Sequence, residues 1–137
     1  MIVLDASALL ELVLETPTGR AVAGRIADPA TGLHAPHLID VEVTQALRRY
    51  VQKREVDASD AADALAYLHT LDLQRHAHEP LLERVWQLRD NLSAYDAVYV
   101  ALAEVLDATL LTCDRPLSRV PGSGARVELV DARGAHR

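Results

Sequence analysis

The chain has 137 residues, half of them apolar, so it is long enough and apolar enough to bury a core of its own. This composition excludes a disordered tail, and a single cysteine, Cys113, excludes a miniprotein held together by internal disulfides. The formal net charge is -6, from 20 acidic and 14 basic residues, and this sign taken alone argues against a nucleic-acid partner.

We expect no export signal in the first residues. The first residues, MIVLD, form no basic segment followed by a long apolar one. No apolar run approaches the ~18–20 residues that cross a bilayer. We therefore expect a cytoplasmic protein with no membrane association.

Strand and helix patterns alternate along the chain, and the loop-like stretches between them are short, which predicts a single domain over residues 1–137. Strands are expected at 2–4, 33–35, 71–73, 109–112 and 126–130. Helices are expected at 7–14, 20–27, 38–53, 59–71, 79–89 and 93–106. Such alternation implies a mostly parallel sheet covered by helices, in which ligands bind beyond the carboxyl ends of the strands.

Two aspartates lie just after the carboxyl ends of expected strands, where ligands bind in such a sheet. Asp5 directly follows the first expected strand, and Asp114 follows the strand expected at 109–112 by two residues. Each has an ordinary structural explanation, because Asp5 could cap the next helix and Asp114 could make an Asx turn.

Two further acids lie on expected helices. Ser93 and Asp96 have the spacing of a capping box, and the helix that follows is apolar on nearly all sides. Asp96 therefore stands at the start of a buried helix, where an ionised carboxylate needs a cation or several hydrogen-bond donors. Glu42 lies at the border of the apolar stripe of the helix expected at 38–53, so both a solvated position and a cleft position are open.

Four carboxylates gathered at one edge of a sheet would repel one another without a cation. Mg²⁺ and Mn²⁺ prefer oxygen ligands, so such a cluster is typical of a site for a hard divalent ion. An ion of this kind can bind phosphate oxygens and activate a water molecule for in-line attack on phosphorus. The expected chemistry is hydrolysis of a phosphodiester.

Four segments carry these acids, and they read VLDASALL, DVEV, YDAVYVALAE and LLTCDRPL. Their order and the length of the chain resemble the PIN-domain nuclease family, in its small branch of VapC-type toxins from bacterial type II toxin–antitoxin systems. The resemblance covers the whole chain. The matching positions are the four acids Asp5, Glu42, Asp96 and Asp114, with Ser7 and Thr112 as supporting polar residues.

The resemblance implies an α/β fold, a three-layer α/β/α sandwich with a mostly parallel central sheet. It also implies an endoribonuclease dependent on Mg²⁺ or Mn²⁺, in which the four acids hold the metal and a metal-activated water attacks cellular RNA. A cognate antitoxin protein would inhibit it, and the chain would form a homodimer and a toxin–antitoxin hetero-oligomer. Candidates for holding the RNA backbone are Arg48, Arg49, Arg89 and Arg115.

Other function classes fit the residues less well. A receiver domain needs a lysine late in the chain, and the sole lysine is Lys53. A haloacid-dehalogenase-type phosphatase needs a second acid two residues after the first, where this chain has Ser7. Structural zinc needs four ligands, usually with cysteine, so the two close histidine pairs are a weak signal. These pairs are His34 with His37 and His76 with His78.

A PIN-like module that binds a protein partner without catalysis remains the alternative. The net charge of -6 does not decide between the two functions, because the four proposed metal ligands account for four of the negative charges. The rest of the surface is then nearly neutral, with arginine as almost its only cation. We expect modest RNA affinity with a shallow dependence on salt.

Overall fold

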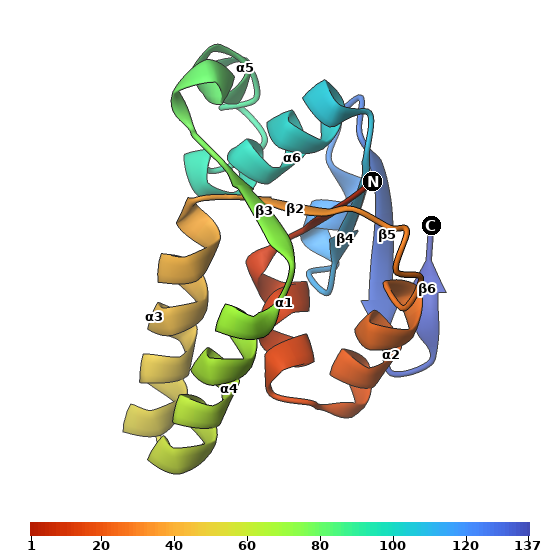
Figure 1. Cartoon of the computed structure of the whole chain (residues 1–137). Helices are drawn as coiled ribbons and strands as arrows, with labels where there is room; N and C mark the ends of the chain where they lie inside the picture. The colour runs from red at the N-terminus through yellow and green to blue at the C-terminus, as the bar shows by residue number, and fades with distance from the viewer.

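A computed structural model describes all 137 residues and contains one six-stranded sheet with the strand order β3-β2-β1-β4-β5-β6 (Figure 1). The first five strands are parallel to their neighbours, and β6 pairs with β5 in the antiparallel direction. The predicted α/β sandwich with a mostly parallel sheet is confirmed. The strands are β1 (Ile2–Leu4), β2 (Leu33–Pro36), β3 (Leu73–His76), β4 (Thr109–Thr112), β5 (Arg126–Asp131) and β6 (Gly134–His136).

Helices form the layers on either side of this sheet. The helix α1 packs against α2, α3 and α4, whereas α6 packs against β1, β2, β4 and α5. No helix combines the length and the apolar character needed to cross a membrane. The helices are α1 (Ala6–Val13), α2 (Pro17–Arg25), α3 (Leu38–Gln52), α4 (Ala58–Thr70), α5 (Leu82–Gln87) and α6 (Ala94–Leu106), with 3₁₀ turns η1 (Glu79–Leu81) and η2 (Pro116–Arg119).

The core lies between the sheet and these helices and contains 32 buried apolar residues. Every residue of β1 is buried, and α6 is buried without interruption from Ala97 to Ala103, as its apolar sequence predicts. The contact between α1 and α2 depends on Gly19, because a Cβ atom there would lie 1.9 Å from the carbonyl oxygen of Glu11. Glycine at this position lets the two helices approach closely.

The structure corrects several predicted boundaries. The strand expected at 71–73 is β3 at Leu73–His76. It is an edge strand in which polar residues follow Leu73, so its sequence lacks the alternation of apolar and polar residues that marks a strand. The helix expected at 79–89 is divided into η1 and α5. The helix expected at 20–27 begins at Pro17, where Thr16 caps it by accepting a hydrogen bond from the Gly19 N–H at 2.9 Å. The sequence did not predict β6, since its turn lacks the usual Asn-Gly or Asp-Gly signal.

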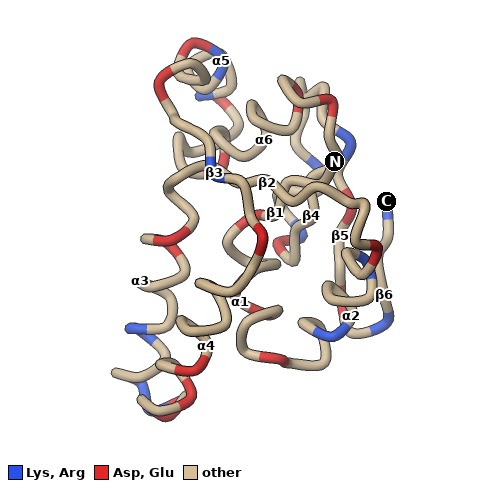
Figure 2. The backbone as a smooth tube through the Cα atoms, viewed as in Figure 1, with Lys and Arg blue, Asp and Glu red and all other residues tan.

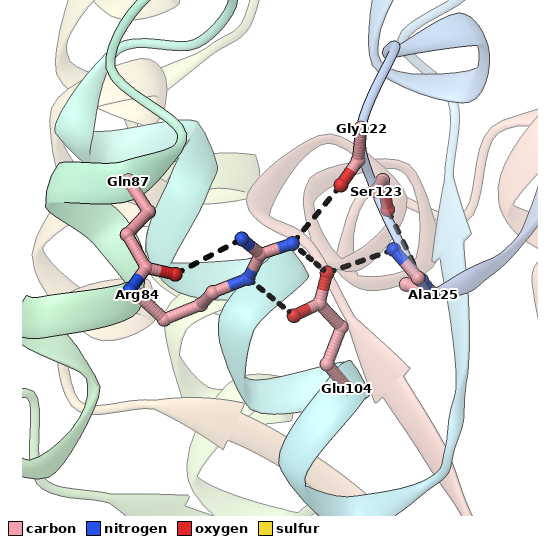
Figure 3. A network of polar contacts seen from close by, with 7 residues as sticks. Arg84, Gln87, Glu104, Gly122, Ser123 and Ala125 are labelled. Atoms are coloured by element: carbon pink, nitrogen blue, oxygen red, sulfur yellow. Dashed lines mark hydrogen bonds and ion pairs between the residues drawn. The ribbon is translucent and has the colours of Figure 1, made fainter.

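An arginine on α5 holds α6 and the loop before β5 together (Figure 3). Arg84 Nε and Nη2 donate to the two carboxylate oxygens of Glu104 at 2.7 and 3.0 Å. Arg84 Nη2 also donates to the Gly122 carbonyl at 3.0 Å, and the Gly124 N–H donates to Glu104 Oε1 at 2.9 Å. This network fixes α6, the helix whose first turn carries Asp96.

Candidate active site

The four predicted acids gather at the carboxyl edge of the parallel strands. Asp5 and Asp114 follow the neighbouring strands β1 and β4, in which Leu4 is in register with Leu111. Burial is the main cause that raises the pKa values of Asp5, Asp96 and Glu42, and neighbouring acids add to it, Asp114 for the first two and Asp96 for Glu42. The structure therefore brings together residues that are up to 109 positions apart in the sequence.

Asp5 is buried and held by three donors. Its Oδ1 accepts hydrogen bonds from Ser7 Oγ at 2.7 Å and from the Ala8 N–H at 2.9 Å, and its Oδ2 accepts one from Thr112 Oγ1. The bond from Ala8 makes Asp5 the N-cap of α1, as the sequence allowed. Burial raises the pKa of Asp5 from 3.8 to about 6, although the three hydrogen bonds act in the opposite direction.

The two hydroxyls around Asp5 are themselves oriented by the main chain after β4. Ser7 Oγ accepts the Cys113 N–H and Thr112 Oγ1 accepts the Asp114 N–H, each at 2.9 Å. Each hydroxyl therefore accepts from the backbone and donates its own proton to Asp5. No hydrogen bond of an Asx turn to the Asp114 carboxylate is present, so that carboxylate is left for other contacts.

Glu42 on α3 is joined to α6 by a residue that the sequence analysis did not single out. The hydroxyl of Tyr99 donates to Glu42 Oε1 at 2.6 Å, and the Tyr99 side chain is fully buried. Burial and the Glu42 carboxylate raise the pKa of Tyr99, which keeps it a neutral donor. A signal was present, because Tyr99 lies three residues after Asp96 and therefore on the same face of α6.

Asp96 lies in the first turn of α6, half-buried beside the other acids. Its N–H donates to Ser93 Oγ at 3.2 Å, which confirms the predicted N-cap. Burial raises the pKa of Asp96, and Asp114 adds to this effect. Glu42 behaves in the same way, since burial raises its pKa more than the bond from Tyr99 lowers it.

The chemistry of this donor set fits a hard divalent cation. All of the side-chain donors are oxygens, and three of the four acids have pKa values raised by an environment that a cation would make more favourable. In the structure as it stands, no three acidic, histidine or cysteine side chains lie close enough to share one ion. The site therefore has the donors of a metal centre in an open arrangement.

The four predicted arginines have different positions. Arg115 directly follows Asp114 and is exposed. Arg48 and Arg49 are exposed on α3, roughly 9 Å further along the helix than Glu42. The guanidinium of Arg89 stacks on a neighbouring tryptophan, 4.5 Å from its ring centroid. Arg115 is thus the candidate next to the acidic cluster.

The histidines of the two predicted pairs contact one another across the pairs, His34 with His76 and His37 with His78. His34 Nδ1 and His76 Nε2 are 2.9 Å apart and share one hydrogen bond, whose direction depends on the tautomers. His78 Nε2 accepts the N–H of Leu38 at the start of α3, also at 2.9 Å. His34 and His76 thus join β2 to the edge strand β3, and His78, two residues after β3, joins the chain there to the start of α3, the helix that carries Glu42.

Comparison with known proteins places these features in a family. The model of the PIN domain matches residues 2–123. A VapC ribonuclease of Mycobacterium bovis is 44% identical over 118 residues, which are 86% of this chain and 89% of the relative. Ribonuclease VapC12 of Mycobacterium tuberculosis is 41% identical over 130 residues, which are 95% of this chain and 99% of the relative.

Solved structures agree with the fold. A crystal structure of a protein from Pyrobaculum aerophilum matches with a TM-score of 0.69 at 24% identity, covering 92% of this chain and 81% of that one. The crystal structure of VapC20 of Mycobacterium tuberculosis, described as a sarcin-ricin loop cleaving toxin, matches with a TM-score of 0.66 at 16% identity. That match covers 86% of this chain and 93% of the other.

Proposed function

This chain belongs to the PIN-domain family, and because its relatives are VapC ribonucleases we propose that it is an endoribonuclease acting as the toxin of a toxin–antitoxin pair. The observation that carries the proposal is the placement of four carboxylates at the carboxyl edge of the sheet, where the charges of Asp96 and Asp114 act on the other acids although the arrangement is open. The relatives are similar along nearly their whole length, which supports the transfer of activity better than fold likeness alone.

We further propose that Asp5, Glu42, Asp96 and Asp114 hold Mg²⁺ or Mn²⁺. When bound, the cation would lower the pKa of a water molecule and orient it for attack on the phosphodiester of cellular RNA. The protein prepares the acids for this task. Three donors prevent the Asp5 carboxylate from rotating, and Tyr99 binds one oxygen of Glu42, which leaves the other oxygen for a ligand.

A toxin of this kind needs a protein that restrains it, so we propose a cognate antitoxin, a homodimer and a toxin–antitoxin hetero-oligomer. Exposed apolar side chains on α3, α5 and α6 support a protein-binding surface. They are Val41, Leu82, Trp86 and Tyr95, each between 53% and 67% exposed. Light scattering of the chain alone, and with the product of the adjacent upstream gene, tests both assemblies.

The decisive experiment compares the chain with its Asp96→Asn variant. Each is induced in cells, and the ends of cleaved molecules are mapped on total RNA. Asn at position 96 keeps the main-chain bond to Ser93, so the helix cap is retained. Asp60→Asn is the matched control, because Asp60 also lies in the first turn of a helix but outside the cluster. We expect new RNA ends after induction of the wild type and of the Asp60→Asn control, and none after induction of Asp96→Asn.

The second candidate, a non-catalytic binding module, is favoured by the cap that Asp5 makes on α1. It predicts that millimolar Mg²⁺ or Mn²⁺ neither raises the melting temperature nor supports cleavage of any structured RNA. The nuclease proposal predicts a metal-dependent rise in melting temperature that Asp96→Asn weakens. Cleavage by Asp96→Asn at the wild-type rate would contradict the assignment of the acids.

A further inference from the structure

A pocket of about 300 Å³ lies between η2 and the hairpin of β5 and β6. This volume is at the lower end of the ~300–1,000 Å³ typical of ligand sites. Figure 2 shows basic positions, in blue, recurring around β5 and β6, and all of those in this part of the chain are arginines. The charged and titratable side chains that line the pocket are Arg115, Arg119, Arg133, Arg137, His136 and Asp131.

The charge of this pocket is opposite to that of the whole chain. Four arginine side chains and one carboxylate side chain line it, whereas the chain carries a net charge of -6. None of the four arginines takes part in an ion pair. The arginines that do so lie elsewhere and pair with acids, namely Arg25 with Glu128, Arg75 with Asp40, Arg84 with Glu104 and Arg126 with Asp107.

The only carboxylate side chain that lines the pocket, that of Asp131, makes its contacts within the hairpin. Asp131 Oδ1 accepts the Arg133 N–H at 2.8 Å and lies 3.2 Å from His136 Nε2, so it closes the turn of the hairpin. Its bonds go to the main chain and to the histidine, and no arginine side chain donates to it. The four guanidinium groups therefore keep their donors free for a ligand.

The pocket lies at the same edge of the sheet as the acids. The parallel strands β4 and β5 are in register at Thr112 and Leu129, and neighbouring strands are only about 4.8 Å apart. Arg115, which lines the pocket, directly follows Asp114 of the acidic cluster. A chain of phosphates that crosses the acids can therefore reach the pocket without a turn around the molecule.

We propose that this pocket binds a phosphodiester group of the substrate RNA adjacent to the cleaved bond. The inference rests on the proposed ribonuclease function and adds the residues that position the substrate. Guanidinium groups bind phosphate oxygens through pairs of parallel hydrogen bonds, which suits several unpaired arginines around one small pocket. On a protein with a net negative charge, such a local site allows RNA to bind in a defined register.

Binding to a fluorescein-labelled single-stranded oligoribonucleotide tests the proposal without relying on cleavage. Fluorescence anisotropy is measured at several salt concentrations with the full chain carrying Asp96→Asn. We expect the double substitution Arg119→Gln/Arg133→Gln to weaken binding and to reduce the slope of log K against log salt by about 1.4, or about 0.7 for each lost phosphate contact. Both residues are exposed, and thermal unfolding checks that the fold is retained.

The matched control is Lys53→Gln/Arg54→Gln, which removes the same charge at the far end of α3. We expect it to leave the slope unchanged. An unchanged slope in the pocket variant, an equal loss in both variants, or no RNA binding at all would overturn the proposal. The first of these results would be expected if the pocket received an acidic protein segment.

Failure of the ribonuclease function gives a different pattern. Suppose that the wild-type protein with Mg²⁺ cleaves no RNA, while the pocket variant still binds RNA more weakly and with a smaller salt slope. The pocket is then confirmed as an RNA-binding site, and the catalytic proposal is contradicted. If the wild type cleaves RNA, the pocket variant should show a raised KM with kcat little changed, since the pocket positions the substrate without touching the reacting atoms.

Discussion

The hydroxyl of Tyr99 donates a 2.6 Å hydrogen bond to Glu42 Oε1 and thereby connects α6 to α3 inside the acidic cluster. Tyr99 is fully buried whereas Glu42 is half-buried, so the donor side of the bond is shielded from water. One oxygen of Glu42 is fixed by this contact and the other remains available. A residue of the hydrophobic core thus determines how one candidate metal ligand is presented.

Substitution Tyr99→Phe should raise the Mg²⁺ concentration needed for half-maximal cleavage by about tenfold, because residues that orient metal ligands have effects of this size. The free energy of unfolding should fall by only about 1 kcal/mol, since the ring still fills its place in the core. Titration of the cleavage rate with Mg²⁺ measures the effect. Tyr95→Phe removes an exposed hydroxyl from the same helix and should change neither quantity. An unchanged metal requirement in Tyr99→Phe would show that the bond has no role in presenting Glu42.

Asp5→Asn should abolish cleavage and stabilise the metal-free protein at neutral pH. The pKa of Asp5 is raised from 3.8 in the unfolded chain to about 6 in the folded one, so the folded state binds the proton more tightly. The free energy of unfolding therefore falls as the pH rises from about 4 to about 6, by up to about 3 kcal/mol at about 1.4 kcal/mol per pKa unit.

Urea unfolding in EDTA at pH 4, 6 and 8 measures this dependence. The stability advantage of Asp5→Asn over the wild type should be greatest at pH 8 and should shrink towards pH 4, where Asp5 is protonated in the folded protein. If the difference between the two proteins is the same at all three pH values, the carboxyl does not titrate as described.

Removal of a hydroxyl beside Asp5 should shift the acidic limb of the pH–rate profile. Ser7→Ala and Thr112→Val each remove a donor that lowers the pKa of Asp5, so the pH of half-maximal cleavage should rise. A shift of about one to two pH units is expected, because a hydrogen bond to a charged group contributes about 1.5–3 kcal/mol. Thr44→Val removes an exposed hydroxyl bonded to the Asp40 carbonyl and should leave the profile in place. A shift to lower pH would contradict the role of these donors.

Arg84→Met should lower the free energy of unfolding by about 1–3 kcal/mol, since it leaves a largely buried Glu104 carboxylate without its bidentate partner. The comparison is Arg126→Met, whose partner Asp107 is 89% exposed, so that its loss should cost under about 1 kcal/mol. Urea unfolding of both variants at one pH provides the test. Equal losses in the two variants would mean that burial does not strengthen the pair.

The local elements could be predicted from the sequence because periodicity and capping act over a few residues. The apolar run of β1, the apolar helix α6 and the cap at Ser93 all lie within short segments, and the structure has them where the patterns indicate. Alternation of strands and helices also predicts a parallel sheet, and a parallel sheet places Asp5 and Asp114 at one edge.

Long-range contacts were decided only by the tertiary structure. Tyr99 and Glu42 are separated by 57 residues, and nothing near either residue indicates the other. The edge strand β3 and the final strand β6 are held by pairing with a neighbour, so their own side chains carry little pattern. The arginine pocket likewise forms only because η2 packs beside the hairpin of β5 and β6, and the sequence did not predict this hairpin. Sequence encodes which chemical groups the chain carries and which short segments fold, whereas packing between distant segments determines which groups meet.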